Sequence, residues 1–272
     1  MRKKPLVILV TNLKFYARWN CVVYLIQNGF IVVFAIQSYF VSRRRPHTWM
    51  FSCLLFTYLM FGLLNSANAT FHLLPNVWKE ALNGSRWMYV EMMTPYVTQS
   101  VVIVSTTCMA LDRTIMTIFV FQHQQMKVSL MLACFATFVN LSAAGLIYFC
   151  CLYAASPVFR LDLFHGAIFY CTYILMLDLI FAVVFFVLTI RRQCRTPVLN
   201  QTQRNVRNSL YVLQILCHVI LVVVPNILWN INVIWPTQLR FMLSVKQFLP
   251  FFFNLSILLT LLLFWRNLRR AS

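Results

Sequence analysis

Seven long apolar stretches, separated by short polar connections, make up most of this chain. A helix needs about 20 largely apolar residues to cross a hydrocarbon core of about 30 Å. The stretches that meet this length run over residues 21–41, 49–74, 89–110, 128–152, 167–190, 210–233 and 241–264. In lipid, helices satisfy their own backbone hydrogen bonds. The pattern therefore predicts an all-α fold, an integral membrane bundle of seven transmembrane helices.

The positions of the prolines and glycines agree with the predicted ends of the helices. Five prolines and two glycines fall in the predicted connections: Pro46, Pro75, Gly84, Pro157, Gly166, Pro197 and Pro236. Three other prolines, Pro95, Pro225 and Pro250, lie inside predicted helices. An intramembrane proline frees a carbonyl that a neighbouring helix, a side chain or water must satisfy. We therefore expect kinks at these three positions.

Composition narrows the class of protein. The chain has 272 residues, of which 61% are hydrophobic and 10% charged, whereas a soluble domain is roughly one quarter charged. We expect one seven-transmembrane domain over residues 1–272, ending in a short cytoplasmic tail at 265–272, because too little chain remains for a separate soluble domain. The 23 basic residues outnumber the 5 acidic ones. They lie between the apolar stretches, which favours contact with anionic lipid rather than nucleic acid.

The basic residues also predict the orientation. With the N-terminus outside and the C-terminus cytoplasmic, thirteen lysines and arginines lie in the inner segments and nine in the outer ones. This distribution agrees with the positive-inside rule. The sequon that begins at Asn83 then lies in the first outer loop, so Asn83 is a candidate glycosylation site.

Nine cysteines lie mostly inside the apolar stretches, without a CxxC pair or metal-ligand spacing. Small buried hydrophobic residues are the simplest interpretation. The alternative for three of them is a disulfide across an outer loop, between Cys171 and either Cys150 or Cys151. We expect neither a metal nor a cofactor.

Two adjacent ionisable residues, Asp112 and Arg113, stand at the inner end of the third stretch. Ionisable side chains at membrane depth cost about 2.5–3.5 kcal/mol on insertion scales, so each needs an explanation. An acid and an arginine can neutralise each other in a resting state and exchange partners when helices move. The alternative is an interfacial pair that anchors the helix end.

Four residues are candidates for a small-molecule site between the helices near the outer leaflet: Glu91, Asp178, Trp229 and Lys246. Asp178 lies in the middle of the fifth stretch and is expected to face the bundle, a polar partner or a bound cation. The alternative is a protonated or paired structural acid, and for Lys246 it is a side chain that extends to the interface. His218, in the sixth stretch, is expected to form interhelical hydrogen bonds.

Several of these residues together resemble a rhodopsin-like receptor. They are Leu111-Asp112-Arg113-Thr114 at the inner end of the third stretch, Pro225 in the sixth, and Pro250-Phe251-Phe252-Phe253 in the seventh. The small size, the phenylalanine-rich stretches and the minimal tail are similar to those of the nematode serpentine chemoreceptors, which are seven-transmembrane and G-protein-coupled. Among these, the class BC group is the most similar.

The resemblance implies a set of roles and partners. Asp112 and Arg113 would be the switch that couples to a heterotrimeric G protein, and Pro225 the kink of the sixth helix. Pro250 and Phe253 would form the inner bend of the seventh helix. The protein would bind a small-molecule ligand at the plasma membrane of a sensory cell. The chain departs from the pattern at Thr114, where an aromatic residue is usual, and in lacking an acid in the second stretch.

Two other classes of function can be compared with the receptor. The chain has no HExxH or GxSxG motif and its five histidines are far apart, so we do not expect an enzyme. A small-molecule transporter or ligand-gated channel is the alternative, because Asp178 and Lys246 lie at membrane depth. Transporters often have internal repeats and glycine-broken helices, whereas this chain has five glycines and no visible repeat.

Overall fold

A computed structural model describes residues 4–42, 49–73, 86–118, 122–153, 157–193, 213, 215–228 and 240–270. All of these residues are helical. The prediction of an all-α fold is therefore confirmed for the described part of the chain.

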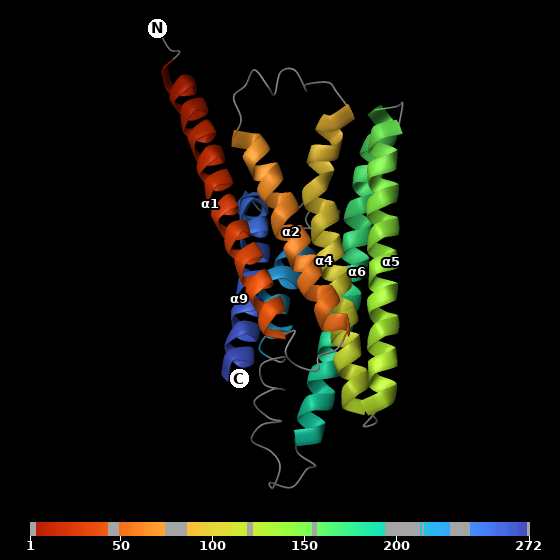
Figure 1. Cartoon of the computed structure of the whole chain (residues 1–272). Coiled ribbons are helices and arrows are strands. Elements are labelled where there is room, and N and C mark those ends of the chain that lie inside the picture. The colour runs from red at the N-terminus through yellow and green to blue at the C-terminus, as the bar shows by residue number, and fades with distance from the viewer. Residues whose placement is uncertain are drawn as a thin grey trace.

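The described residues form seven helical elements, one in each predicted stretch. They are α1 (Lys4–Ser42), α2 (Trp49–Leu73), α4 (Arg86–Ile118), α5 (Gln122–Tyr153), α6 (Pro157–Gln193), the helix Ile215–Leu228 with its π-helical segment η2 (Val219–Val223), and α9 (Arg240–Arg270). Figure 1 shows the helices side by side in one bundle, with the N-terminus and the C-terminus at opposite ends.

Within the described residues, four helices are long and apolar enough to cross a membrane. Their spans are Trp19–Ser42 in α1, Trp49–Phe71 in α2, Lys127–Cys150 in α5 and Leu249–Arg266 in α9. Tyr173–Leu188 in α6 and Ile215–Leu228 are apolar but shorter over their described residues. These spans mark the chain as a helical membrane protein.

Several helices extend beyond the predicted boundaries. Helix α1 begins at Lys4, and α9 continues to Arg270, so most of the predicted tail at 265–272 is helical. The prediction that Pro157 and Gly166 lie in a connection is wrong, because both belong to α6. Proline is well suited to the first position of a helix, where its missing N–H has no partner to lose. Apolarity marks the part of a helix that lies in lipid, not the part that continues into water.

The hydrophobic core is formed mainly by α1, α2, α4 and α9, and α5, α6 and the helix Ile215–Leu228 contribute further buried residues. Aromatic pairs join α2 to α9: the ring centroids of Phe51 and Phe264 are 5.0 Å apart, and those of Phe61 and Phe253 are 5.4 Å apart. Contacts of this kind stabilise a pair of rings by about 0.5–1.5 kcal/mol beyond the burial of their area. These two pairs therefore connect α2 to the C-terminal helix α9.

Helices α1 and α2 approach each other closely at Gly62, which is buried. A Cβ atom added there would lie 2.8 Å from Val32 Cγ2 and 3.2 Å from the backbone oxygen of Asn28. Small residues let helix backbones come together in membranes. Gly62 is therefore a contact point between the two helices.

Helix α4 packs against α2, α5 and α6, and polar side chains accompany this packing. Asn65 Nδ2 of α2 donates a hydrogen bond to Thr98 Oγ1 of α4 at 3.0 Å. Tyr148 of α5 donates to Thr94 Oγ1 at 3.3 Å. Asn65 belongs to a polar interruption of the second apolar stretch, and the contact with α4 accounts for its place there.

Deeper along α4, three side chains from three helices meet. Ser105 Oγ lies 3.1 Å from Thr57 Oγ1 of α2. It also accepts a hydrogen bond from Asn140 Nδ2 of α5 at 3.1 Å. All three residues are at least nine-tenths buried. This group, which we call the Ser105 triad, joins α2, α4 and α5.

Candidate functional site

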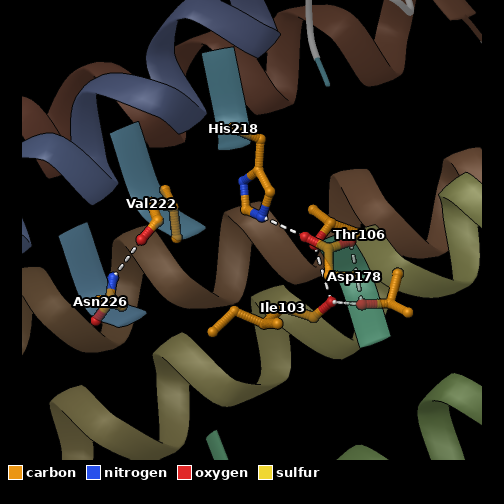
Figure 2. A network of polar contacts seen from close by, with 7 residues as sticks. Ile103, Thr106, Asp178, His218, Val222 and Asn226 are labelled. Carbon is orange, nitrogen blue, oxygen red and sulfur yellow. Dashed lines mark hydrogen bonds and ion pairs between the residues drawn. The ribbon is translucent and has the colours of Figure 1, made fainter. Parts of the chain in front are cut away.

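An acid and an imidazole meet inside the bundle. Asp178 comes from the middle of α6, and His218 directly precedes the π-helical segment η2. Asp178 Oδ2 and His218 Nε2 are 2.8 Å apart, and the two side chains are 4% and 12% exposed (Figure 2). This is an ion-pair distance when His218 is protonated. Asp178 faces a polar partner in the bundle, as expected from the cost of an unpaired charge in lipid.

The two side chains are close enough for an ion pair, but they are not aligned as a hydrogen bond requires. Neither Asp178 Oδ2 nor His218 Nε2 makes a well-aligned hydrogen bond within the described part of the chain. At 2.8 Å, however, a protonated imidazole and a carboxylate attract each other strongly in a medium of low dielectric constant. The contact therefore has the distance of an ion pair but not the alignment of a hydrogen bond.

The other carboxylate oxygen of Asp178 lies against α4. Thr107 Oγ1 donates to Asp178 Oδ1 at 3.2 Å and to the backbone oxygen of Ile103 at 2.8 Å. A hydroxyl has one proton, so these two acceptors share it. Thr106 donates to the same Ile103 oxygen at 2.8 Å (Figure 2). The carboxylate therefore lies between α4 and the helix Ile215–Leu228.

A small cavity adjoins the ion pair. Its volume is about 30 Å³, and since a water molecule needs roughly 10–15 Å³ on this measure, one or two water molecules fit. Six polar residues contribute to its lining: Tyr58, Thr106, Arg113, Asp178, His218 and Thr260. They come from α2, α4, α6, the helix Ile215–Leu228 and α9. Polar side chains from five helices therefore line one cavity.

Tyr58 and Thr260 line the cavity from α2 and α9. Tyr58 is 2% exposed and lies within hydrogen-bonding reach of Thr260, close to Asp178. Buried tyrosines usually place their hydroxyl on a polar partner. The pair extends the polar contacts of Asp178 to both of these helices.

Arg113 lines the same cavity from α4. Its Nη1 lies 3.6 Å from the sulfur of Met116, one turn further along the helix. The preceding residue, Asp112, is 1% exposed. Arg113 and Asp178 therefore line the same cavity from α4 and α6.

The helix that carries His218 is irregular at the next turn. The N–H of Val224 donates to the oxygen of Val219, five residues back, which closes a π turn. Pro225 follows and has no N–H, so the α-helical pattern of hydrogen bonds cannot continue through it. Asn226 Nδ2 donates instead to the oxygen of Val222 at 2.7 Å (Figure 2). The irregular turn lies where the sequence predicts a kink.

Pro250 and Phe253 lie in α9, away from the cavity. Pro250 is inside the helix, and Phe253 is 1% exposed and packs against Phe61 of α2. Thr260, which lines the cavity, lies seven residues further along, about 10 Å at 1.5 Å per residue. Phe253 therefore belongs to the core between α2 and α9, and Pro250 lies three residues before it in the same helix.

Of the four ligand candidates, the structure brings only Asp178 to the cavity. Glu91 lies in α4 and Lys246 in α9, but the side chains of both lie outside the described part of the chain. Trp229 and the glycosylation candidate Asn83 also lie outside it. Glu91 and Arg113 are 22 residues apart on α4, about 33 Å. The cavity beside Arg113 is therefore not the pocket predicted near the outer leaflet.

Sequence reasoning did not assign Tyr58, Thr107 or Thr260 to a site, and it did not pair His218 with Asp178. The sequence did contain a feature from which that pair could have been predicted. Asp178 is the only charged residue of the fifth apolar stretch, and His218 is the only basic residue of the sixth. Each needs a partner at membrane depth, so the two could have been matched. The hydroxyl residues carry no such signal, because threonine and tyrosine are common throughout the chain.

The described residues contain no group of three histidines, cysteines or acids that could hold a metal ion. Asp178 and His218 are two potential ligands, but a structural zinc site needs four. Cys150 is a free thiol, whereas the side chains of Cys151 and Cys171 are not among those described. The arrangement is therefore one of charges and hydroxyls.

Comparison of the sequence with protein-family models finds no match, and comparison with curated proteins finds none either. What the site can do follows from its own chemistry. A carboxylate, an imidazole and a guanidinium border one small cavity. Such groups can exchange partners when helices move, and an imidazole can take up or release a proton.

Proposed function

We propose that this protein is a G-protein-coupled chemosensory receptor with seven transmembrane helices. A small-molecule ligand binds between the helices, and Asp112 and Arg113 pass the signal to a heterotrimeric G protein at the cytoplasmic face. The observation that carries the proposal is that Arg113 lines one cavity with polar groups from four other helices. A movement of any of these helices changes which partners Arg113 can reach.

The physical basis is a set of polar contacts with two arrangements. An arginine forms strong, directional bonds to a carboxylate, and a short displacement exchanges one acceptor for another. Packed helices have discrete arrangements, so small displacements at a ligand site are amplified. A ligand that binds one arrangement more tightly shifts the population toward it. Arg113 and Asp178, which line the same cavity, are the two groups that would take part in this exchange.

The distribution of charge supports a cytoplasmic location for this end of the bundle. Arg113 lies near the C-terminal end of α4, which is the end of the bundle that carries the C-terminus (Figure 1). Exposed basic side chains lie near the same end on three helices: Lys127 on α5, Arg191 on α6 and Arg266 on α9. Cytoplasmic segments are enriched in lysine and arginine.

The proposal is tested by replacing Arg113 in a cell that reports G-protein signalling. A screen of small volatile and water-soluble compounds on the intact protein identifies an activating compound. Arg113→Ala should then lower the response by about tenfold or more, within the usual range of 5- to 150-fold for coupling between sites. Delivery to the cell surface should stay unchanged, because Arg113 is only partly buried.

Arg266→Ala is the matched control. Arg266 is an exposed arginine near the same end of the bundle, so its loss should leave the response within about twofold of the parent, as for most surface changes. Equal responses in the parent and in Arg113→Ala, at equal surface amounts, would contradict the assigned role of Arg113.

A second function is favoured by the Asp178–His218 pair. Acids and histidines that meet inside a helix bundle also form the proton relays of transporters. A proton-coupled transporter would drive uptake of the activating compound, or carry current, in liposomes that contain no G protein. Uptake driven by a pH gradient would favour this function over the receptor.

A further inference from the structure

One side of α1 is not covered by the described part of the bundle. Helix α1 packs mainly against α2 and α9, and Figure 1 shows it at the edge of the bundle. Away from these neighbours, exposed residues recur at the three- and four-residue spacing of one helix face. We call this surface the exposed α1 face, and it consists of Gly29, Phe30, Val33, Ile36, Gln37 and Phe40.

Gln37 is the member of this face that does not suit lipid. Its side chain is exposed and makes no hydrogen bond within the described part of the chain. A carboxamide has two N–H donors and an acceptor oxygen, and lipid tails offer no partner to either. Thr137, which is exposed on α5, avoids this cost because its hydroxyl donates to the oxygen of Ala133 in its own helix at 2.8 Å. Gln37 therefore requires a polar partner that the described bundle does not supply.

The position of Gln37 along α1 keeps its amide away from the lipid headgroups. Gln37 lies within the membrane span Trp19–Ser42, five residues before the end of that span, about 7.5 Å at 1.5 Å per residue. The Cα–Cβ bonds of a helix tilt toward its N-terminus. The side chain of Gln37 therefore points into the hydrocarbon core rather than toward the nearer interface.

Gly29 lies about two helical turns before Gln37, with Val33 between them at four-residue spacing. A Cβ atom added at Gly29 would have no atom within 4 Å, so the backbone of α1 is open on this side. In membranes, small residues let two helix backbones approach each other, and polar side chains form hydrogen bonds between the helices. Both features of a membrane helix contact therefore lie on the exposed α1 face.

We propose that the exposed α1 face is the contact between two copies of this chain, with the Gln37 amides of the two copies hydrogen-bonded to each other. An amide is complementary to a second amide, because the N–H of each can donate to the oxygen of the other. The two copies have the same orientation in the membrane. A two-fold axis along the membrane normal therefore places two parallel α1 helices side by side and brings identical residues together. The dimer does not depend on the proposed receptor function.

The experiment uses the purified full-length protein in phosphatidylcholine vesicles, with a donor or an acceptor fluorophore at the C-terminus. Energy transfer between copies, followed as the protein is diluted with lipid, gives the dissociation constant of the dimer. Purification removes other membrane proteins, so only a second copy can produce the signal. Gln37→Leu keeps a similar volume without the amide. It should raise the dissociation constant by about tenfold, because two hydrogen bonds between helices are lost together.

Gly29→Leu is a second variant on the same face. In a single copy an added Cβ atom meets nothing, so the fold should persist, whereas in the dimer the new side chain holds the two backbones apart. We expect a loss of affinity of about tenfold or more. Gly145→Leu on α5 is the matched control, because Gly145 is also exposed and its added Cβ also has no atom within 4 Å. It should leave the dissociation constant within about twofold of the parent.

Two results would overturn the proposal. One is a parent protein that stays monomeric in the vesicles, which would leave the exposed α1 face to lipid or to a different membrane protein. The other is association that neither Gln37→Leu nor Gly29→Leu weakens, which would place the contact on another face. If Gln37→Leu does not fold, the comparison of Gly29→Leu with Gly145→Leu decides. Association of the parent without compound-evoked signalling removes the receptor and leaves the dimer, and signalling by a monomer does the reverse.

Discussion

At the scale of single residues, buried polar side chains hold this bundle together. Helices in lipid are not driven together by the hydrophobic effect, because lipid tails are as apolar as the side chains. Hydrogen bonds such as those of the Ser105 triad therefore contribute to the choice of neighbours. Thr57, Ser105 and Asn140 each come from a different helix and each is buried.

Asn140→Leu should test this contribution. The change removes the donor to Ser105 while keeping a similar volume, and we expect a loss of about 0.6–1.7 kcal/mol in the free energy of unfolding, the range for such bonds in membranes. Unfolding in bicelles by a denaturing detergent measures it. A double-mutant cycle with Ser105→Ala isolates the pair.

Ser142→Ala is the control on the same helix, because Ser142 is exposed and its loss should change stability by less than about 0.5 kcal/mol. Full additivity of Asn140→Leu and Ser105→Ala would mean that the hydrogen bond between them contributes nothing.

The inward position of Asp178 could be predicted from its sequence alone, but most of its partners could not. The cost of a charge in lipid requires Asp178 to face inward. Which side chains contact Asp178 depends on the rotation of α6 about its axis relative to α2, α4 and α9. The sequence does not determine this rotation, because an apolar helix in a bundle presents similar side chains to lipid and to its neighbours. For this reason Tyr58 and Thr260 became visible only in the structure.

At the scale of whole elements, backbone proximity determines which helices can be neighbours. Helices α1 and α2 approach each other closely at Gly62, where an added Cβ would lie 3.2 Å from the backbone oxygen of Asn28. A side-chain tip such as that of Val32 can move aside, but a helical carbonyl cannot. The two helices must therefore separate if this position gains a side chain.

Gly62→Ala should lower the free energy of unfolding by about 1–3 kcal/mol, the usual effect of adding volume to a packed site. Gly29→Ala is the matched control, because Gly29 is also helical, lies on α1 and has no atom within 4 Å of the added Cβ. There the change should be neutral or stabilise by up to about 1 kcal/mol, since alanine favours the helix. Unfolding in bicelles measures the stability of both variants. Equal effects at the two positions would show that the close approach of the helices at Gly62 does not contribute to stability.

The existence of the helices was predictable, and their ends were not. A run of about 20 apolar residues has few alternatives to a helix in lipid, and each of the seven stretches contains one of the described helices. The ends depend on what happens in water, where α1 starts well before its apolar stretch and α6 begins at Pro157. The π turn before Pro225 was also beyond prediction, because proline alone does not select between a kink and a π turn.

At the scale of the molecule, the arrangement of the helices fits an odd number of crossings. The two termini lie at opposite ends of the bundle (Figure 1). The sequence predicts seven crossings with the N-terminus outside, and within the described residues four helices are long and apolar enough to cross a membrane. The other three share the bundle with them and are expected to cross beside them.

Epitope tags test this topology. An antibody should reach a tag at the N-terminus on intact cells, and a tag at the C-terminus only after the membrane is made permeable, because basic residues keep the C-terminal end inside. Microscopy or flow cytometry measures both. Tags that are reached from the same side would require an even number of crossings and would contradict the seven-helix topology.

The polar contacts of α4 also bear on how the protein is made. Its threonines and serines, with Asp112, keep α4 out of the group of helices that are apolar enough to enter lipid unaided. The residues that satisfy them belong partly to α5 and α6, which the ribosome synthesises later. We therefore expect newly made α4 to be held at the insertion machinery, or beside a membrane chaperone, until those helices emerge.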